Sequence, residues 1–381
     1  MESIYLDNNA TTRIDDRVVD TMLPLLREQY GNPSSMHKMG QLAAHRVDEA
    51  RAQVATLIGA RPREIVFTGG GSEANNLAIR GVLAARPTKR HVVTTAVEHD
   101  SVLRLCRQLE REGVRVTYCG VDKLGRLDLD QLADAIDDET ALVAVMHANN
   151  ETGVLFPIEQ VGAITRRRNV PLLVDAIQTV GKIPVDVASL PVDFLTIAGH
   201  KIHGPKGVGA LYVRRGKRLR PLIIGGHQER DLRGGTENTA GIVGLGAAAE
   251  LAAKRLADEA GRITRLRDRL EAGICERISI ASINGDREHR LLNTTNISFR
   301  TLEAEALLLL LSENGIYVSS GSACSSGSLE PSHVLQAMGI EPERAHGAVR
   351  FSLSGFTTEA EIDQTLDRLP ALIDRLAAVT P

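Results

Sequence analysis

Cys324 is the residue of this sequence whose surroundings most clearly suggest chemistry. It lies in the run "SSGSACSSGS", residues 319–328, where serine, glycine and alanine leave no large side chain to bury a thiol. A cysteine thiolate is a nucleophile, and small residues leave a loop free to move between two places. We therefore predict a mobile loop over 319–330 with a reactive cysteine. An incidental thiol in a flexible loop is the alternative.

The other three cysteines lie in apolar segments and have no CxxC spacing. This pattern indicates neither a zinc site nor a disulfide framework. We expect Cys106, Cys119 and Cys275 to be reduced, buried and unreactive.

Polar side chains follow the ends of several apolar segments that read as strands. A glycine turn, Gly69-Gly70-Gly71-Ser72, follows the first of them. Free backbone N–H groups at such a helix start suit a phosphate, although a plain strand-to-helix connection has the same sequence. Because active sites of open α/β sheets lie beyond the carboxyl ends of the strands, we expect the other strand ends to converge there. Their polar residues are Glu98, His99, His147, Asn149, Asn150, Asp175, Gln178, His200 and Lys201.

This combination matches what pyridoxal phosphate requires. A lysine bonds to the cofactor aldehyde, and an aspartate keeps the ring nitrogen protonated so that the ring withdraws electrons. A histidine stacks on the ring face. Lys201 directly follows a predicted strand, whereas the rival Lys206 lies in the turn "GPKG". We therefore assign the first role to Lys201 and the second to Asp175.

The elements that would position these residues form an α/β pattern. Short β-branched runs alternate with helical segments at 64–68, 91–97, 115–119, 141–147, 170–176, 193–198 and 209–215. This alternation predicts a mostly parallel sheet covered by helices. A long helix over 240–277 then leads to a smaller α+β unit. We predict a large domain over 16–256 and a small domain of 1–15 with 257–381.

The composition excludes several classes of protein. The chain has 381 residues, 43% of them hydrophobic and 24% charged, with a formal net charge of −3. No basic stripe indicates nucleic acid, and no apolar stretch approaches the length of a membrane span. The start "MESIYLDNNATT" is unlike a targeting signal, so we expect a cytoplasmic protein with a small-molecule substrate.

Many motifs of the chain, in order, resemble the NifS/IscS-type cysteine desulfurases. These belong to the class-V aminotransferases and have the pyridoxal-phosphate fold of aspartate aminotransferase. The resemblance runs nearly end to end, over "YLDNNATT" (5–12), "GNPSSMH" (31–37), "EIVFTGGGSEANNLAI" (64–79), "EHDSV" (98–102), "HANNETG" (147–153), "VDAIQTVGKIPVD" (174–186), "GHKIHGPKGVGALYVRR" (199–215), "RGGTEN" (233–238), "SSGSACSSGSLEPSHVL" (319–335) and "RFSLS" (350–354).

The resemblance implies a role for each matching residue. Gly71, Ser72 and His200 would hold the phosphate, joined by Thr236 from the other subunit of a homodimer. Asn150 would contribute to cofactor binding and, with Arg350, hold the substrate carboxylate. The remaining roles fall to Lys201 and Asp175 as above, to Gln178 as donor to the ring hydroxyl, to His99 for stacking and proton handling, and to Cys324 as sulfur acceptor.

The implied reaction converts L-cysteine to L-alanine, with the sulfur held on Cys324 as a persulfide. An iron–sulfur scaffold or another acceptor protein would receive it. No metal is expected at the cofactor site, although Cys324 could contact a cluster in a scaffold complex. A selenocysteine lyase, another enzyme of this cofactor class and a non-catalytic sulfur carrier are the alternatives.

Two positions depart from many relatives. Ser72 replaces a threonine and keeps its hydroxyl, whereas Ala198 replaces a phosphate-binding serine and loses one. A hydrogen bond to a charged group contributes about 1.5–3 kcal/mol, so we expect somewhat weaker cofactor retention.

Overall fold

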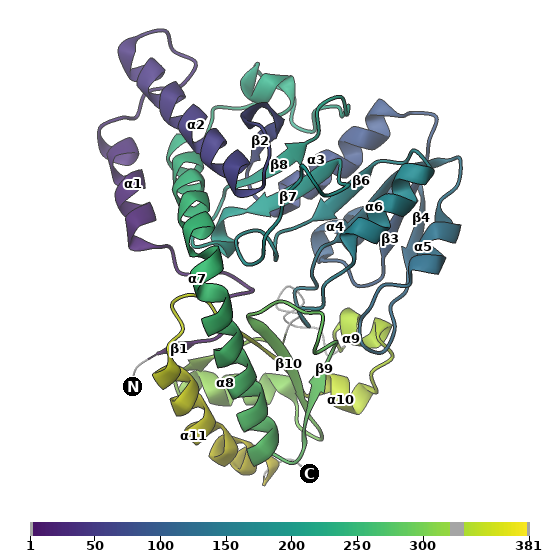
Figure 1. Ribbon diagram of the computed structural model, residues 1–381, viewed down its shortest axis with the longest axis vertical. Helices are drawn as coiled ribbons and strands as arrows, with labels where there is room; N and C mark the ends of the chain where they lie inside the picture. The colour runs from purple at the N-terminus through teal and green to yellow at the C-terminus, as the bar shows by residue number, and fades with distance from the viewer. Residues whose placement is uncertain (1–2, 321–330, 379–381) are drawn as a thin grey trace.

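The computed structural model describes residues 3–320 and 331–378 of the chain. A large sheet with helices on both faces forms its upper part in Figure 1, and a smaller sheet with its own helices forms the lower part. The long helix α7 (Thr239–Arg277) runs from one part to the other.

The large sheet has seven strands in the order β2-β8-β7-β6-β5-β3-β4. Strand β8 is antiparallel to both of its neighbours, and the other pairs are parallel. The predicted α/β fold with a mostly parallel sheet is therefore confirmed, and each strand falls on a predicted apolar run. The strands are β2 (Ile65–Thr68), β3 (His91–Thr95), β4 (Arg115–Cys119), β5 (Thr140–Met146), β6 (Leu172–Asp175), β7 (Phe194–Ala198) and β8 (Gly209–Val213).

Helices cover both faces of this sheet. Leu142 and Ala144 of β5 pack with the helices of one face, and Val143 and Val145 pack with those of the other. This alternation follows from the period of two of a strand, and burial on both faces explains the uninterrupted apolar runs. The first face is covered by α3 (Gly71–Ala85) and α4 (Asp100–Arg111), and the second by α1 (Asp16–Arg27), α2 (Lys38–Leu57), α5 (Leu129–Ala135), α6 (Ile158–Arg167) and the N-terminal part of α7.

The smaller sheet is antiparallel and has the order β12-β10-β9. A separate core of Leu270, Phe299, Phe351 and Leu369 fixes it to its helices, and Leu6 from the start of the chain joins this core. The elements are β9 (Ala281–Asn284), β10 (Thr294–Phe299), β12 (Ala348–Ser352), the parallel pair β1 (Ile4–Tyr5) and β11 (Ile316–Tyr317), and the helices α8 (Ala304–Glu313), α9 (His333–Ala337), α10 (Pro342–His346) and α11 (Glu359–Ala377).

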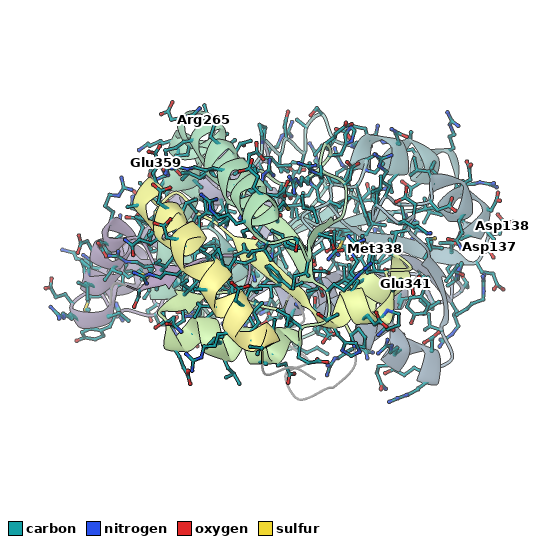
Figure 2. The ribbon with its side chains drawn as sticks, turned by 90° about the horizontal axis from the view of Figure 1, so that it is seen from below. Asp137, Asp138, Arg265, Met338, Glu341 and Glu359 are labelled. Atoms are coloured by element: carbon teal, nitrogen blue, oxygen red, sulfur yellow. The ribbon has the colours of Figure 1, made fainter. Side chains whose placement is uncertain are left out.

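Helix α7 belongs to both cores. Its residues Ile242 and Leu245 pack with the large sheet, whereas Leu266 and Leu270 pack with the small one. Figure 2 shows the C-terminal part of α7 beside α11, with Arg265 and Glu359 labelled on the two helices. This division along α7 supports the predicted boundary near residue 256, which stays a prediction.

Three short 3-10 turns complete the described fold. They are η1 (Pro62–Glu64), η2 (Gly199–Lys201) and η3 (Gln228–Asp231), of which η2 directly follows β7. Over residues 3–320 and 331–378, we find no helix with the length and apolar character that a membrane crossing requires.

Candidate active site

A cavity of about 260 Å³ opens where β5, β6 and β7 end. Met146, Asp175 and Ala198, the last residues of these three strands, line it together with the start of α3. The structure thus gathers most of the predicted site residues around one space. These are Gly71, Ser72, His99, Asn150, Asp175, Gln178, His200 and Lys201.

Asp175 presents a buried carboxylate to this cavity. Its Oδ2 accepts a hydrogen bond from Asn75 Nδ2 at 2.8 Å, and its Oδ1 accepts one from the backbone N–H of Ile177 at 3.1 Å. Asn75 lies on α3 and also donates to Ser101 Oγ at 3.0 Å. Sequence reasoning gave Asn75 no role, although it lies within the motif "SEANNLAI". Its contact holds Asp175 in one orientation.

Lys201 ends η2 and directs its amine toward the N-terminal segment. Its Nζ donates to the backbone oxygens of Asn9 at 2.5 Å and Ala10 at 2.7 Å. Lys206 is exposed in the turn that follows. The structure therefore places the predicted lysine at the cavity and its rival on the surface.

His99 caps the start of α4 with its ring. Its Nδ1 accepts from the backbone N–H of Ser101 at 3.1 Å and lies 2.9 Å from Ser101 Oγ. Burial lowers the pKa of His99, with the positive charge of Lys201 acting in the same direction, although the negative charge of Asp175 raises it. Ser101, which sequence reasoning also missed, fixes the ring through its position in "EHDSV".

The glycine turn leaves the start of α3 open to the cavity. Gly70 precedes the helix with φ +146° and makes no side-chain cap, so the first N–H groups of α3 keep their donor capacity for a ligand. A Cβ on Gly71 would lie 2.1 Å from Ile177 Cδ1 and 3.6 Å from Ala198 Cβ. A larger residue at position 71 would therefore displace the Ile177 side chain, and position 198 faces the same helix start.

His200 also lines the cavity. Its Nδ1 is 3.2 Å from Thr11 Oγ1. Burial, helped by the charge of Lys201, lowers the pKa of His200 to about 4, so the ring is neutral at pH 7. A neutral histidine can still donate one hydrogen bond to an anion.

Arg350 lies behind Asn150 and does not line the cavity. It is only 2% exposed, and it forms an ion pair with Asp7 at 2.6 Å and donates to the backbone oxygen of Asn150 at 3.0 Å. Its buried Nε has no hydrogen-bond partner among the described residues. The predicted carboxylate clamp stays a prediction.

Thr236 and Cys324 complete the predicted set. Thr236 is exposed and does not line the cavity of its own chain. Cys324 lies outside the described residues, as does most of the predicted loop over 319–330. On one side of this gap the backbones of Ser319 and Arg350 are hydrogen bonded, and on the other Ser332 Oγ donates to Glu151.

The remaining cysteines differ from one another in burial. Cys106 and Cys119 are buried, which raises their pKa values to about 12 and about 11. Cys275 is partly exposed rather than buried, because it lies on the side of α7 away from the small core. Burial nevertheless raises its pKa, and this disfavours the reactive thiolate.

The residues around the cavity fit pyridoxal phosphate. An amine, a held carboxylate and an uncapped helix start face one space, which are the groups needed for an aldehyde, a ring nitrogen and a phosphate. Lys201 would hold the aldehyde, Asp175 the ring nitrogen, and Gly71 with Ser72 the phosphate.

Comparison with known proteins identifies the family. Residues 4–365 match the sequence profile of the family described as Aminotransferase class-V. The chain belongs to this family. Its members depend on pyridoxal phosphate, so the predicted cofactor is confirmed.

Curated relatives and solved structures agree over the whole chain. A cysteine desulfurase of Nostoc sp. is 55% identical over 381 residues, covering 100% of this chain and 95% of the relative. The cysteine desulfurase NifS of Azotobacter vinelandii is 50% identical over 382 residues, with 100% and 95% covered. A solved NifS-like protein superposes with a TM-score of 0.93 at 41% identity, covering 98% of this chain and 100% of its own. The predicted NifS-type resemblance, α/β fold and cysteine desulfurase activity are confirmed.

Proposed function

We propose that this enzyme removes the sulfur from L-cysteine, releases L-alanine and holds the sulfur as a persulfide on Cys324. The observation that carries the proposal is the convergence of Lys201, Asp175 and His99 on one cavity of a class-V aminotransferase. The flanks of the Cys324 segment attach beside this cavity, at Arg350 and Glu151.

Each residue at the cavity has a separate task. Pyridoxal phosphate, when bound, supplies an electron-withdrawing ring that stabilises negative charge at the substrate Cα. Asp175 keeps the ring nitrogen protonated, and Asn75 keeps Asp175 in place. Lys201 supplies the amine for the aldehyde and is the base that takes the Cα proton.

Seven further residues orient the cofactor and substrate. Gln178 donates to the ring hydroxyl, and His99 stacks on the ring. Asn150 and Arg350 hold the substrate carboxylate, and Arg350 is bonded to the backbone oxygen of Asn150, which lines the cavity. Gly71, Ser72 and His200 hold the phosphate.

Sulfur transfer requires a thiolate from outside the ring chemistry. The Cys324 sulfur bonds to the substrate sulfur while the substrate Cβ–S bond breaks. The electron pair of that bond stays with the carbon, which takes up a proton to give alanine. His99, whose pKa is lowered by burial, or the substrate amine accepts the Cys324 proton.

We propose a homodimer that passes its sulfur to an acceptor protein. Thr236 is exposed on the surface of its own chain, as expected for a residue that completes the phosphate site of a partner subunit. Ile224, in the neighbouring segment, is 86% exposed, and the carbonyl of Ile223 accepts a hydrogen bond from Gly234. Such an exposed apolar side chain supports a protein contact. The acceptor, an iron–sulfur scaffold or another protein, and the cytoplasmic location stay predictions.

Product analysis tests this function. The purified protein with pyridoxal phosphate should convert L-cysteine to equal amounts of alanine and, in the presence of a thiol reductant, sulfide. A colourless protein that makes neither product would favour a sulfur carrier, and activity confined to selenocysteine would favour a lyase.

A further inference from the structure

Lys182 is a second lysine in contact with a residue of the site, and the proposed function gives it no task. It follows Gln178 by four residues in the segment after β6. Its Nζ donates to Gln178 Oε1 at 2.7 Å and to Asn9 Oδ1 at 3.0 Å. Gly181 precedes it at φ +76°, with its Cβ position 2.7 Å from Ile202 Cγ2, so this turn packs directly against the residue that follows Lys201.

The contact with Lys182 determines which way the Gln178 amide faces. Lys182 Nζ donates to Oε1 of Gln178, so the carbonyl side of this amide faces Lys182. Nε2 then faces the other way and donates one hydrogen to the backbone oxygen of Asn9 at 3.0 Å. Because Gln178 lines the large cavity, its second N–H can reach a ligand there.

The contact with Asn9 has the same consequence for a second amide. Asn9 is 1% exposed, and its Oδ1 accepts from Lys182 and from Asn293 Nδ2 at 3.1 Å. Its Nδ2 therefore donates to the backbone oxygen of Asn150 at 3.2 Å and to Thr294 Oγ1 at 2.9 Å. The same Asn9 receives the amine of Lys201 at its backbone oxygen.

The environment of Lys182 agrees with this arrangement. Burial, and then the charges of Lys201 and Arg350, lower the pKa of Lys182 well below its ordinary value. The oxygens of Gln178 and Asn9 both accept hydrogen bonds from this amine.

We propose that Lys182 is a positioning residue that orients the amides of Gln178 and Asn9, so that Gln178 Nε2 donates to the ring hydroxyl of the cofactor. This rests on the proposed function, in which Gln178 is the donor to that hydroxyl. Lys182 itself touches neither cofactor nor substrate.

Binding of two ring compounds to the cofactor-free full-length protein tests the proposal. The first is 4′-deoxypyridoxine 5′-phosphate, which has the hydroxyl but no aldehyde and so cannot bond to Lys201. The second is the same compound without its ring hydroxyl. By calorimetry, Lys182→Met should bind the first about tenfold more weakly than wild type and the second equally well. Lys206→Met, at the exposed turn, should bind both as wild type does.

Gln178→Met separates the two proposals. If Gln178→Met loses affinity for the hydroxyl compound and Lys182→Met does not, the role of Lys182 is wrong while that of Gln178 stands. If Gln178→Met binds the hydroxyl compound as tightly as wild type does, the proposed role of Gln178 is wrong, and the inference on Lys182 is wrong with it. The double variant should bind no more weakly than Gln178→Met alone, because both changes remove one contact.

A purely structural role would give a different pattern. Equal losses for both compounds in Lys182→Met would overturn the proposal. If the methionine variant does not fold, Lys182→Gln, which keeps an N–H donor on a shorter side chain, is compared in the same way. Its loss must again be confined to the compound with the hydroxyl.

Discussion

Lys201 and Lys206 lie five positions apart and differ in their surroundings. The first lines the cavity and is held by two backbone oxygens, and the second is exposed. Lys201→Ala should therefore abolish turnover and the visible absorption of the bound cofactor, whereas Lys206→Ala should keep both. Absorption spectra and alanine assays of the two variants check this. Loss of colour in Lys206→Ala alone would reverse the assignment.

The burial of Glu98, next to His99, leads us to predict that the stability of the protein depends on pH. It is fully buried, its Oε2 has no partner among the described residues, and burial raises its pKa from 4.5 to about 8. Between about pH 4.5 and pH 8, the carboxyl group of Glu98 is therefore protonated in the folded protein and ionised in the unfolded chain. The contribution of Glu98 to the free energy of unfolding is fully present below about pH 4.5 and is lost as pH rises through about 8.

Glu98→Gln should remove this dependence because the amide does not titrate. Thermal unfolding of both proteins from pH 5 to pH 9 measures it. The wild type should lose stability more steeply, by at most about 1.4 kcal/mol per pH unit for one proton. Parallel curves for the two proteins would contradict a raised pKa at Glu98.

Strand β8 sets the position of the turn that begins α3. A Cβ on Gly209 would lie 2.5 Å from the backbone oxygen of Ile197 and 2.8 Å from the carbonyl carbon of Gly70, and such backbone atoms cannot move aside individually. Gly209→Ala should cost about 1–3 kcal/mol of stability and weaken cofactor binding by displacing Gly70. Urea unfolding and cofactor titration measure the two effects.

Gly261→Ala is the matched control on α7. Gly261 is exposed, and the nearest atom to its Cβ position is Arg265 Nη1 at 3.6 Å. This change should leave cofactor binding unaltered and should not destabilise the helix, because alanine is the better helix former. Equal behaviour of the two variants would show that the contact of β8 with the glycine turn is unimportant.

The strands of the large sheet could be predicted because each is buried on both faces and therefore appears in the sequence as an apolar run. Strands β1 and β11 could not, since they have two residues each and show no period. The same contrast holds at the site. Asp175 ends β6 and Lys201 lies just after β7, so both could be predicted from the strand pattern, whereas Asn75 lies on a helix and Asn9 in the N-terminal segment. Their positions depend on packing between distant parts of the chain.

The whole molecule should be a dimer with shared cofactor sites. If Thr236 reaches the phosphate of the partner, Thr236→Ala should sediment as a dimer and bind pyridoxal phosphate up to about tenfold more weakly. Sedimentation and cofactor titration of the variant check both statements. A wild-type monomer with full activity would contradict the shared site.

The residues proposed for the reaction come from both sheets of the structure. Lys201, Asp175 and the glycine turn belong to the large sheet, whereas Arg350 and the flank of the Cys324 segment at Ser319 belong to the small one. Activation of the substrate and removal of its sulfur should therefore be separable. Cys324→Ala should keep the first and lose the second, because Cys106, Cys119 and Cys275 all have raised pKa values.

Mass spectrometry of the protein after a single turnover with L-cysteine tests the central claim most directly. The account predicts one added sulfur atom on the peptide that contains Cys324. In Cys324→Ala it predicts no persulfide and no alanine, while the cofactor spectrum still responds to cysteine. Alanine formation by this variant at the wild-type rate, or a wild-type persulfide on any of the other three cysteines, would contradict it.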